Sequence, residues 1–540
     1  MPLFPVLTII LPLLGAGVTL GLSRLSRARP YAYYIALIAV GLTVALLLTF
    51  GWMESVVVIP SLWQPSLLFG AALALQIDAT VQPLALALAL VTCSVVLVEL
   101  GHSAEPHPRL MAMLQALLAA GLVALWSANL LTTLISWAIY DLLQAVGHVA
   151  AGGSARTAVR CLIFGGLATL LLWGGALLSG DGVGSELWSL ITLGGAQMTL
   201  WAAAGILRLW AYPFHLAAPD DLASAPSLAV PLWLGPIVGW GLWLRLALAN
   251  GGSIPGGPWV LALAAVNLAM GGFLAWCCES PRRILLWVGM GASGALLWAA
   301  GLAGESAAGV IVAGSVAWVL GVGVISLGDG LRPDAPWWSI PSLVGALALL
   351  GVPLTLGFVT QAHLVGGLTR EGRLGWEGAF FLGNLLLVPS LVRWLLTSPS
   401  PRLPNHRWQA VVRGAGLGLP VLLLTVAGLH PSLLVDGVPV PRLGQLFAMP
   451  DLMGWVLWVV SLAGGGVLAW QEGALRPKIE LLLNAIHDLL SLEWLYGAVV
   501  GALDRGFSVL RAADEVVGGG GALLWSWLLF LLLLLVWGSR

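Results

Sequence analysis

The sequence predicts an all-α polytopic membrane protein that crosses the bilayer about sixteen times. Of its 540 residues, 59% are hydrophobic and only 9% are charged, and the mean hydropathy is +0.97. A soluble protein carries roughly 25% charged residues, so most of this surface must face lipid or other apolar helices. The apolar runs are continuous over about twenty residues, whereas strands of a membrane barrel alternate polar and apolar positions.

Each predicted span is an apolar run bounded by turn or charged residues. The spans cover residues 4–23, 31–51, 79–100, 110–126, 128–148, 157–178, 188–211, 228–249, 257–278, 282–303, 306–327, 340–363, 376–397, 412–430, 452–470 and 520–538. The 69 glycines and 31 prolines fit this prediction, because membrane helices tolerate both residue types. The first span is followed by Arg24, Arg27 and Arg29 with no basic residue before it, which is the reverse of a cleavable signal peptide.

The basic loop after the first span predicts the orientation of the chain. Loops rich in Lys and Arg stay in the cytoplasm, so we expect the amino terminus outside. Alternation along the later spans then assigns most of the remaining basic residues to the inside. We therefore expect an integral protein of a prokaryotic inner (cytoplasmic) membrane.

Residues 478–515 carry polar side chains at helical spacing among leucines, valines and aromatics. The polar positions are Glu480, Asn484, His487, Ser491, Asp504, Ser508, Arg511 and Glu515. This pattern predicts an amphipathic helix, either along a partner subunit or in the plane of the membrane interface as a lipid anchor.

Composition and cysteine spacing exclude several classes of function. The net charge of -1 argues against nucleic-acid binding, which needs a basic stripe. The four cysteines, Cys93, Cys161, Cys277 and Cys278, lie in apolar runs without the spacing of a zinc or redox motif. We expect no metal and no cofactor, and hence no redox centre in this chain, so that any electron transfer belongs to a partner.

Four segments between residues 76 and 363 occur in a characteristic order. They are the Asp-led run QIDATVQPLALALALVTCSVVLVEL (76–100), SANLLTTLISW ending at Trp137, RLWAYPFHLAAPDD (208–221) and GALALLGVPLTLGF ending at Phe358. In these segments and their order the chain resembles the antiporter-like subunits of complex I, of Mrp-type multisubunit sodium/proton antiporters and of membrane-bound hydrogenases. The resemblance covers more than half of the chain.

The resemblance implies a fold with two inverted five-helix repeats, each with a helix broken near the midplane. It also implies partners, namely other membrane subunits of a respiratory, hydrogenase or antiporter complex. The expected divisions are 1–109 (N-terminal helices), 110–250 (first repeat), 251–398 (second repeat), 399–475 (additional helices), 476–516 (lateral amphipathic helix) and 517–540 (C-terminal anchor).

Family members are thought to move protons along buried ionisable groups, many of them lysines, and this chain lacks most of them. The family's fifth-helix Glu corresponds to Ala138, its seventh-helix Lys to Arg208, and a Lys in the second repeat to Leu320. After Phe358 the chain has Gln361 where an ionisable residue is usual, and the single lysine, Lys478, lies outside the spans.

Arg208 cannot replace a lysine as a proton relay, because a guanidinium keeps its proton at any accessible pH. Asp141 lies three residues after Ala138, which suggests a similar helical face and a carboxylate partner for Arg208. The alternative is that both side chains are solvated near helix ends.

Three histidines and three prolines are further candidate residues of the ion pathway. His215 keeps the family's histidine, and His148 and His363 lie near span ends where they can titrate near neutral pH, although structural roles are commoner. Pro213, Pro219 and Pro353 are interpreted as helix breakers that free backbone groups around a polar cavity, which in the family is the translocation path. Arg245 and Arg393 are expected near the interfaces without a role.

Three functions fit the sequence. The first is a membrane subunit of a complex I-like or Mrp-type assembly that takes part in proton or sodium translocation. The second is a degenerate, non-conducting scaffold of the same assembly, which the missing lysines favour. The third is a stand-alone secondary transporter, against which the amphipathic tail argues.

Overall fold

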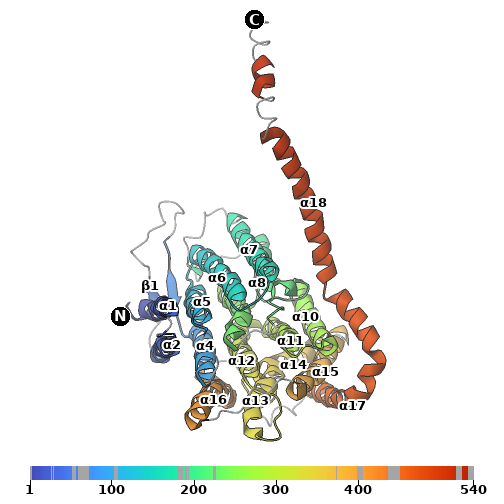
Figure 1. The fold of residues 1–540 in the computed structure, drawn as a ribbon. Coiled ribbons are helices and arrows are strands. Elements are labelled where there is room, and N and C mark those ends of the chain that lie inside the picture. Colours follow the sequence, from blue (N-terminus) through green and yellow to red (C-terminus); the bar gives the residue numbers. More distant parts are fainter. Residues whose placement is uncertain are drawn as a thin grey trace. The chain divides into compact units, whose positions relative to one another are not determined.

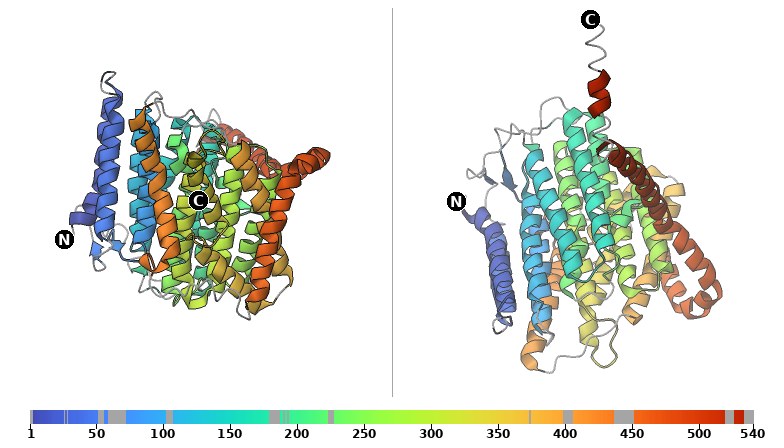
Figure 2. Two further views of the ribbon diagram at one scale, coloured as in Figure 1. Left: turned by 90° about the horizontal axis from the view of Figure 1, so that it is seen from below. Right: turned by 45° about the horizontal axis from the view of Figure 1, so that its top comes forward.

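The structure is a computed structural model, which describes residues 3–25, 27, 29–50, 56–58, 72–101, 107–178, 187–188, 191, 194–222, 227–372, 374–397, 406–435, 451–518 and 526–532. The chain divides into two compact units, residues 1–479 and residues 480–540. Figures 1 and 2 show the first unit as a bundle of long helices packed side by side. The chain is an integral membrane protein, since thirteen helices in the described part are long and apolar enough to cross a bilayer.

The thirteen helices account for most of the predicted spans. Two others, 188–211 and 340–363, fall on interrupted helices whose pieces are shorter than a full crossing. The last predicted span, 520–538, lies largely outside the described residues, and only 526–532 are described there, as helix.

The amino-terminal region contains three crossings and a small β-ribbon. Its elements are α1 (Leu3–Ser23), α2 (Tyr31–Phe50), β1 (Val56–Val58), β2 (Leu75–Ile77) and α4 (Gln82–Gly101). The two strands pair antiparallel with Val56 opposite Ile77. The all-α class is confirmed, and this two-stranded ribbon is an addition that the sequence analysis did not predict.

Five crossings follow, and the fourth of them is interrupted. The elements are α5 (Pro108–Trp126), α6 (Leu130–Ala150), α7 (Ala155–Leu178), α8 (Gly195–Arg208), the short 3-10 helices η2 (Phe214–Ala217) and η3 (Ser227–Leu234), and α9 (Pro236–Ala249). Asn129 begins α6 as its N-cap, because its Oδ1 accepts the N–H of Thr132 at 3.0 Å. After Arg208 the backbone leaves the helix, with Trp210 at φ 53° and Pro213 lacking an N–H to continue the ladder.

The next five crossings repeat this order. They are α10 (Pro258–Cys277), α11 (Pro281–Leu302), α12 (Ala307–Leu327), the broken pair α13 (Ile340–Leu349) and α14 (Phe358–Glu371), and α15 (Leu374–Thr397), with short 3-10 helices η4 (Gly304–Ser306) and η5 (Pro336–Ser339). The break contains Gly351 at φ 68°, Pro353 and Leu354 at φ 73°. Because each set has an odd number of crossings, the second set starts from the opposite side of the membrane, as inverted repeats require.

The carboxyl-terminal region contains α16 (Arg407–Leu429), η6 (Pro431–Leu433), α17 (Leu452–Leu490) and α18 (Glu493–Gly518). Helix α17 is 39 residues long and continues past residue 470, the predicted end of a span, through Pro477 into the amphipathic segment. That segment is divided instead at Ser491 and Leu492, where Leu492 has φ 57°.

Burial within the first unit separates central from peripheral helices. In α12, 94% of an 18-residue apolar stretch is buried, and in α11 the share is 89%. The corresponding stretches of α1 and α7 are only 28% and 33% buried. Helices α4 and α16, far apart in the sequence, lie side by side (Figure 2). Helix α12 packs against α9 and η3 of the first set, whereas helices such as α1 and α7 present most of their side chains to the outside of the bundle.

Candidate functional site

A buried ion pair lies where α8 ends. Arg208, the last residue of α8, donates two hydrogen bonds to the carboxylate of Asp141 on α6, one of them at 2.7 Å between Nη2 and Oδ2. The guanidinium carbon also lies 4.2 Å from the centroid of the Trp137 ring, and Nη2 is 3.3 Å from the hydroxyl of Thr169. Arg208 is 6% exposed and Asp141 is 5% exposed, so neither is solvated. A forked pair of this kind holds both charges in a fixed orientation in an apolar interior.

The expectation that Asp141 shares a helical face with Ala138 is wrong. Ala138 is exposed, whereas Asp141 faces the interior together with Trp137 and Tyr140. A separation of three residues leaves two side chains about 60° apart around the helix, which is enough to put one toward lipid and the other inside.

A second charged cluster lies at the carboxyl end of α6. His148 Nε2 lies 2.7 Å from Asp221 Oδ1, and the N–H of Ser154 donates to Asp221 Oδ2 at 2.8 Å. Arg160 on α7 donates to Asp220 Oδ1 at 2.5 Å. Pro219 lies immediately before these two carboxylates, in the loop that leaves η2. The cluster therefore joins α6, α7 and the loop after the first break.

Asp221 lies outside the membrane-spanning helices, and its surroundings favour the carboxylate. Burial by itself raises the pKa of Asp221, but hydrogen bonds from the N–H and hydroxyl of Ser154, the nearby His148 and the hydroxyl of Thr157 bring that pKa below its ordinary value of 3.8. The carboxylate thus contributes stability above its ordinary pKa, and this contribution is lost as the pH falls through the lower folded-state pKa.

We expect Asp221→Asn to lower the melting temperature of the detergent-purified protein near neutral pH. The difference from the wild type should shrink as the pH falls below about 4, because the wild-type carboxylate is then protonated as well. Melting curves between about pH 3 and pH 7 measure this difference. Glu305→Gln, which removes an exposed carboxylate, is the control. A difference for Asp221→Asn that stays constant over this range would contradict the expected linkage.

His215 lies on η2 between the two repeats. It is 5% exposed, stacks on Tyr212 with ring centroids 5.3 Å apart and contacts Trp287 of α11 at 4.8 Å. The residues that line the adjacent pocket are Leu209, Trp210, His215, Ala218, Trp233, Pro236, Leu285, Leu286, Gly289, Met290, Trp318 and Val322. His215 is the only titratable side chain among these lining residues, so this pocket is predominantly apolar.

Asn267 connects the first break to the second repeat and is a residue that was not predicted from the sequence. Its Oδ1 accepts the N–H of Tyr212 at 2.8 Å, and its Nδ2 donates to the carbonyl of Met290 on α11 at 2.8 Å. Asn267 is 2% exposed within α10. An amide inside an apolar run was the only signal in the sequence that pointed to this connection.

The second break is held by neutral side chains. Gln361 Nε2 donates to Asn384 Oδ1 at 3.1 Å and to the carbonyl of Leu350 at 3.3 Å. Leu320 is fully buried, and His363 lies one turn along α14, where its Nδ1 is 2.9 Å from the carbonyl of Val359. The second repeat thus has an amide pair next to its break, where the first repeat has an ion pair.

Two arginines that were expected near interfaces are tied into the protein. Arg245 is 4% exposed, and its Nη1 lies 3.0 Å from Asp78 Oδ2, just before the start of α4. Arg393 bonds to Glu472 and to carbonyls of α10. In the described part of the chain no three His, Cys, Asp or Glu side chains are grouped so as to hold a metal ion.

Comparison with curated proteins gives partial matches, while no protein-family model matches the sequence. The chain is 27% identical over 278 residues to NADH-quinone oxidoreductase subunit N of Heliobacterium modesticaldum, which covers 46% of this chain and 58% of that protein. It is 24% identical over 349 residues to subunit N of Mycobacterium sp. (strain JLS), covering 57% of this chain and 74% of that protein. Against subunit N 2 of Acidobacterium capsulatum it is 28% identical over 281 residues and covers 56% of that protein. The chain thus spans little more than half the length of two of these three relatives.

Two solved structures match over nearly the whole chain. A chain of the membrane-bound sulfane sulfur reductase, an archaeal respiratory membrane complex, has a TM-score of 0.74 at 16% identity and covers 98% of this chain and 99% of its own. A chain of the Mrp complex from Dietzia sp. DQ12-45-1b has a TM-score of 0.75 at 17% identity and covers 99% of this chain and 63% of its own. At such identities the likeness concerns the fold, and it includes the regions that the curated relatives do not match.

Proposed function

We propose, from the premise that this chain belongs with the antiporter-like membrane subunits to which its sequence and fold are similar, that it is a subunit of a multisubunit membrane complex that translocates protons or sodium ions. The observation that carries the proposal is the interruption of the fourth crossing in both five-crossing sets, with buried polar side chains around each break. Broken helices place free backbone groups and charged side chains where an ion crosses, in a region that otherwise excludes them.

In this proposal Arg208 acts as a fixed positive charge at the first break. It pairs with Asp141 in the apolar interior, and an approaching cation competes with the guanidinium for this carboxylate. Protons are exchanged by the titratable groups, Asp141, His148, His215 and His363, because the guanidinium keeps its proton. Pro213, Pro219 and Pro353 keep the surrounding backbone from closing into continuous helices.

The partners that we propose are other membrane subunits, together with the surrounding lipid bilayer. The relatives are named as subunits of an oxidoreductase, and the two structural neighbours are chains of larger membrane complexes. We propose a prokaryotic cytoplasmic membrane with the amino terminus outside, and the distribution of basic loops and the bacterial and archaeal sources of the similar proteins support this. The proposed electron transfer belongs to those partners.

The second candidate function is a non-conducting scaffold of the same assembly. Its specific support is the second repeat, where Leu320, Gln361 and Asn384 are neutral and the described residues next to the break offer only His363 as a titratable group. A scaffold requires the fold and the contacts with its neighbours, but no continuous series of ionisable groups.

Ion flux in liposomes that contain the purified native assembly distinguishes the two candidates. If the chain conducts, Asp141→Asn should lower flux by about tenfold or more, equivalent to ~1.4 kcal/mol on the barrier, because the pathway loses its buried carboxylate. The assembly should still purify with the same subunits. Arg156→Gln, which removes an exposed charge at the start of α7, should leave flux unchanged. Equal flux in Asp141→Asn and wild-type assemblies of the same composition would favour the scaffold.

A further inference from the structure

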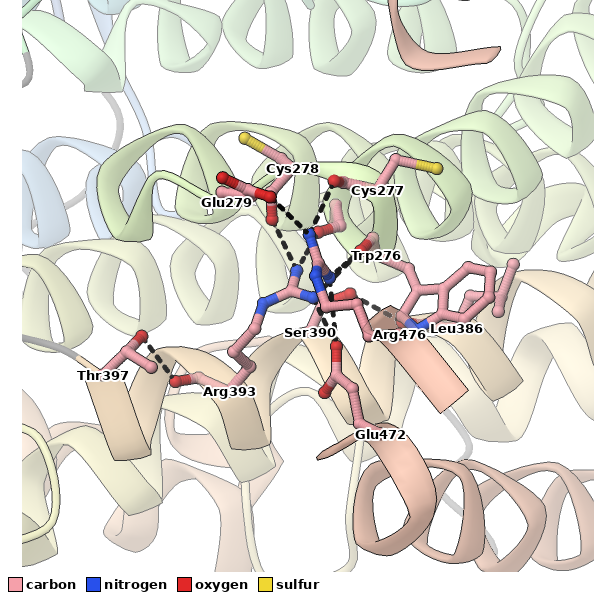
Figure 3. Close-up of polar contacts among 11 residues, drawn as sticks. Trp276, Cys277, Cys278, Glu279, Leu386, Ser390, Arg393, Thr397, Glu472 and Arg476 are labelled. Atoms are coloured by element: carbon pink, nitrogen blue, oxygen red, sulfur yellow. Dashed lines mark hydrogen bonds and ion pairs between the residues drawn. The ribbon is translucent and has the colours of Figure 1, made fainter. Parts of the chain in front are cut away.

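The carboxyl end of α10 is capped by side chains from two other helices. The last four carbonyl groups of an α-helix have no partner within the helix, and an unsatisfied carbonyl is costly away from water. At the end of α10 these include the carbonyls of Ala275, Trp276 and Cys277, and Cys278 adds the next one. Figure 3 shows two guanidinium groups directed at this end of the helix.

Arg393 of α15 and Arg476 of α17 divide these carbonyls between them. Arg393 donates to the carbonyls of Ala275, Trp276 and Cys278 at 2.7, 3.0 and 2.7 Å. Arg476 donates to the carbonyls of Trp276 and Cys277 at 3.0 and 2.9 Å (Figure 3). Every one of the four carbonyls thus accepts from a positively charged group, and positive charge is also what the carboxyl end of a helix dipole favours.

Glu472 of α17 links the two guanidiniums. Its carboxylate accepts a hydrogen bond from Arg393 and lies 3.2 Å from Arg476 Nη1. The side chains of Arg393, Glu472 and Arg476 are 11%, 12% and 16% exposed, so water screens them little. We call these three residues the guanidinium clamp. It fastens α10, α15 and α17 together at one end.

Helices α10 and α15, which the clamp fastens to α17, also carry the amide side chains that bond the two breaks. Asn267 lies on α10 about 12 Å before Ala275, at 1.5 Å per residue, and bonds the first break through the N–H of Tyr212. Asn384 lies on α15 about 14 Å before Arg393 and bonds the second break through Gln361. Both amides lie between two and three helical turns from the clamp on the same helices, with Pro389 between Asn384 and Arg393 in α15, so a displacement of the helix ends at the clamp also displaces the amides.

We infer that Arg393, Glu472 and Arg476 are positioning residues that fix both interrupted helices relative to α17. A shift of α17 at the clamp moves α10 and α15 together, and with them the amides that hold Tyr212 and Gln361. The inference rests on the proposed function only in treating the two breaks as parts of one pathway.

Hydrogen exchange of the full-length chain in its purified assembly tests this inference. Glu472→Gln keeps the size of the side chain and removes the charge that unites the guanidiniums, and Arg393→Gln removes the shared cap. Amides of residues 209–212, 350–352 and 354–357 should exchange at least about fivefold faster in both variants, while α4 exchanges as in the wild type. Arg393→Lys should give an intermediate rate, since an ammonium keeps the charge but lacks the fork.

Arg332→Gln is the matched control. It removes a guanidinium from another buried cluster, in which Arg332 Nη1 lies 3.0 Å from Asp329 and Arg413 bonds the same carboxylate. This variant should leave both breaks at their wild-type rates. Faster exchange confined to the end of α10 would overturn the inference, because the clamp would then be only a local cap of that helix. Faster exchange spread over all helices would also overturn it, because the clamp would then stabilise the whole protein without a specific effect on the breaks. Exchange rates do not depend on ion flux, so this result and the flux measurement succeed or fail separately.

Discussion

Asp141→Leu is expected to lower the free energy of unfolding by about 3–5 kcal/mol, the largest single effect that the structure predicts. The substitution leaves Arg208 charged, 6% exposed and without its carboxylate. A buried charge without a partner costs far more than the hydrogen bonds that were lost. Denaturation in mixed micelles, or thermal melting in detergent, measures the change.

The matching double substitution separates loss of the pair from loss of packing. Asp141→Leu combined with Arg208→Met replaces both charges by apolar groups, and we expect its stability to return close to that of the wild type. Asp334→Asn is the surface control, because Asp334 is 57% exposed in its ion pair with Arg332 and such pairs contribute about 0–1 kcal/mol. A double variant as unstable as the sum of both single variants would refute the ion-pair explanation.

Gly357→Ala is expected to cost about 1–3 kcal/mol by forcing the second break open. An added Cβ at Gly357 would lie 1.8 Å from the carbonyl oxygen of Ala348, and a backbone atom cannot move aside as a flexible side chain can. Relief requires α13 and α14 to separate. Thermal melting of the purified protein gives the size of the effect, and protease sensitivity near residues 350–357 gives its place.

Gly378→Ala provides the comparison for that substitution. No atom lies within 4 Å of an added Cβ at Gly378, which is inside α15. Alanine is the better helix former by roughly 0.5–1 kcal/mol, so this variant should be as stable as the wild type or slightly more stable. Similar melting temperatures for the two variants would mean that the contact between the halves of the break is not tight.

The clamp and the ion pair lie on different helices but have similar chemistry. Each places guanidinium groups where helix ends or breaks leave polar groups inside an apolar protein. Arginine suits both positions, because its fixed fork bonds carboxylates and carbonyls bidentately and its charge does not depend on pH. The near absence of lysine is therefore consistent with arginines that position helices, while titration is left to carboxylate and imidazole groups.

Much of the fold was predictable because its signals are local. Apolar runs of about twenty residues predicted the crossings, and prolines at Pro213 and Pro353 predicted both breaks. Local signals failed where helices are apolar on every side. The sequence did not separate the lipid-facing side of α6 at Ala138 from the interior side at Asp141, and it did not distinguish the end of a crossing from the continuous helix α17.

The sequence by itself determined the membrane environment, the order of the crossings and the places where helices break, since each of these depends on neighbouring residues alone. The tertiary structure decided which polar groups meet. Asp141 and Arg208 are 67 residues apart, and Arg476 bonds a carbonyl 199 residues away. In an apolar surrounding a buried charge must find a partner wherever the packing of helices brings one, and packing depends on the whole chain.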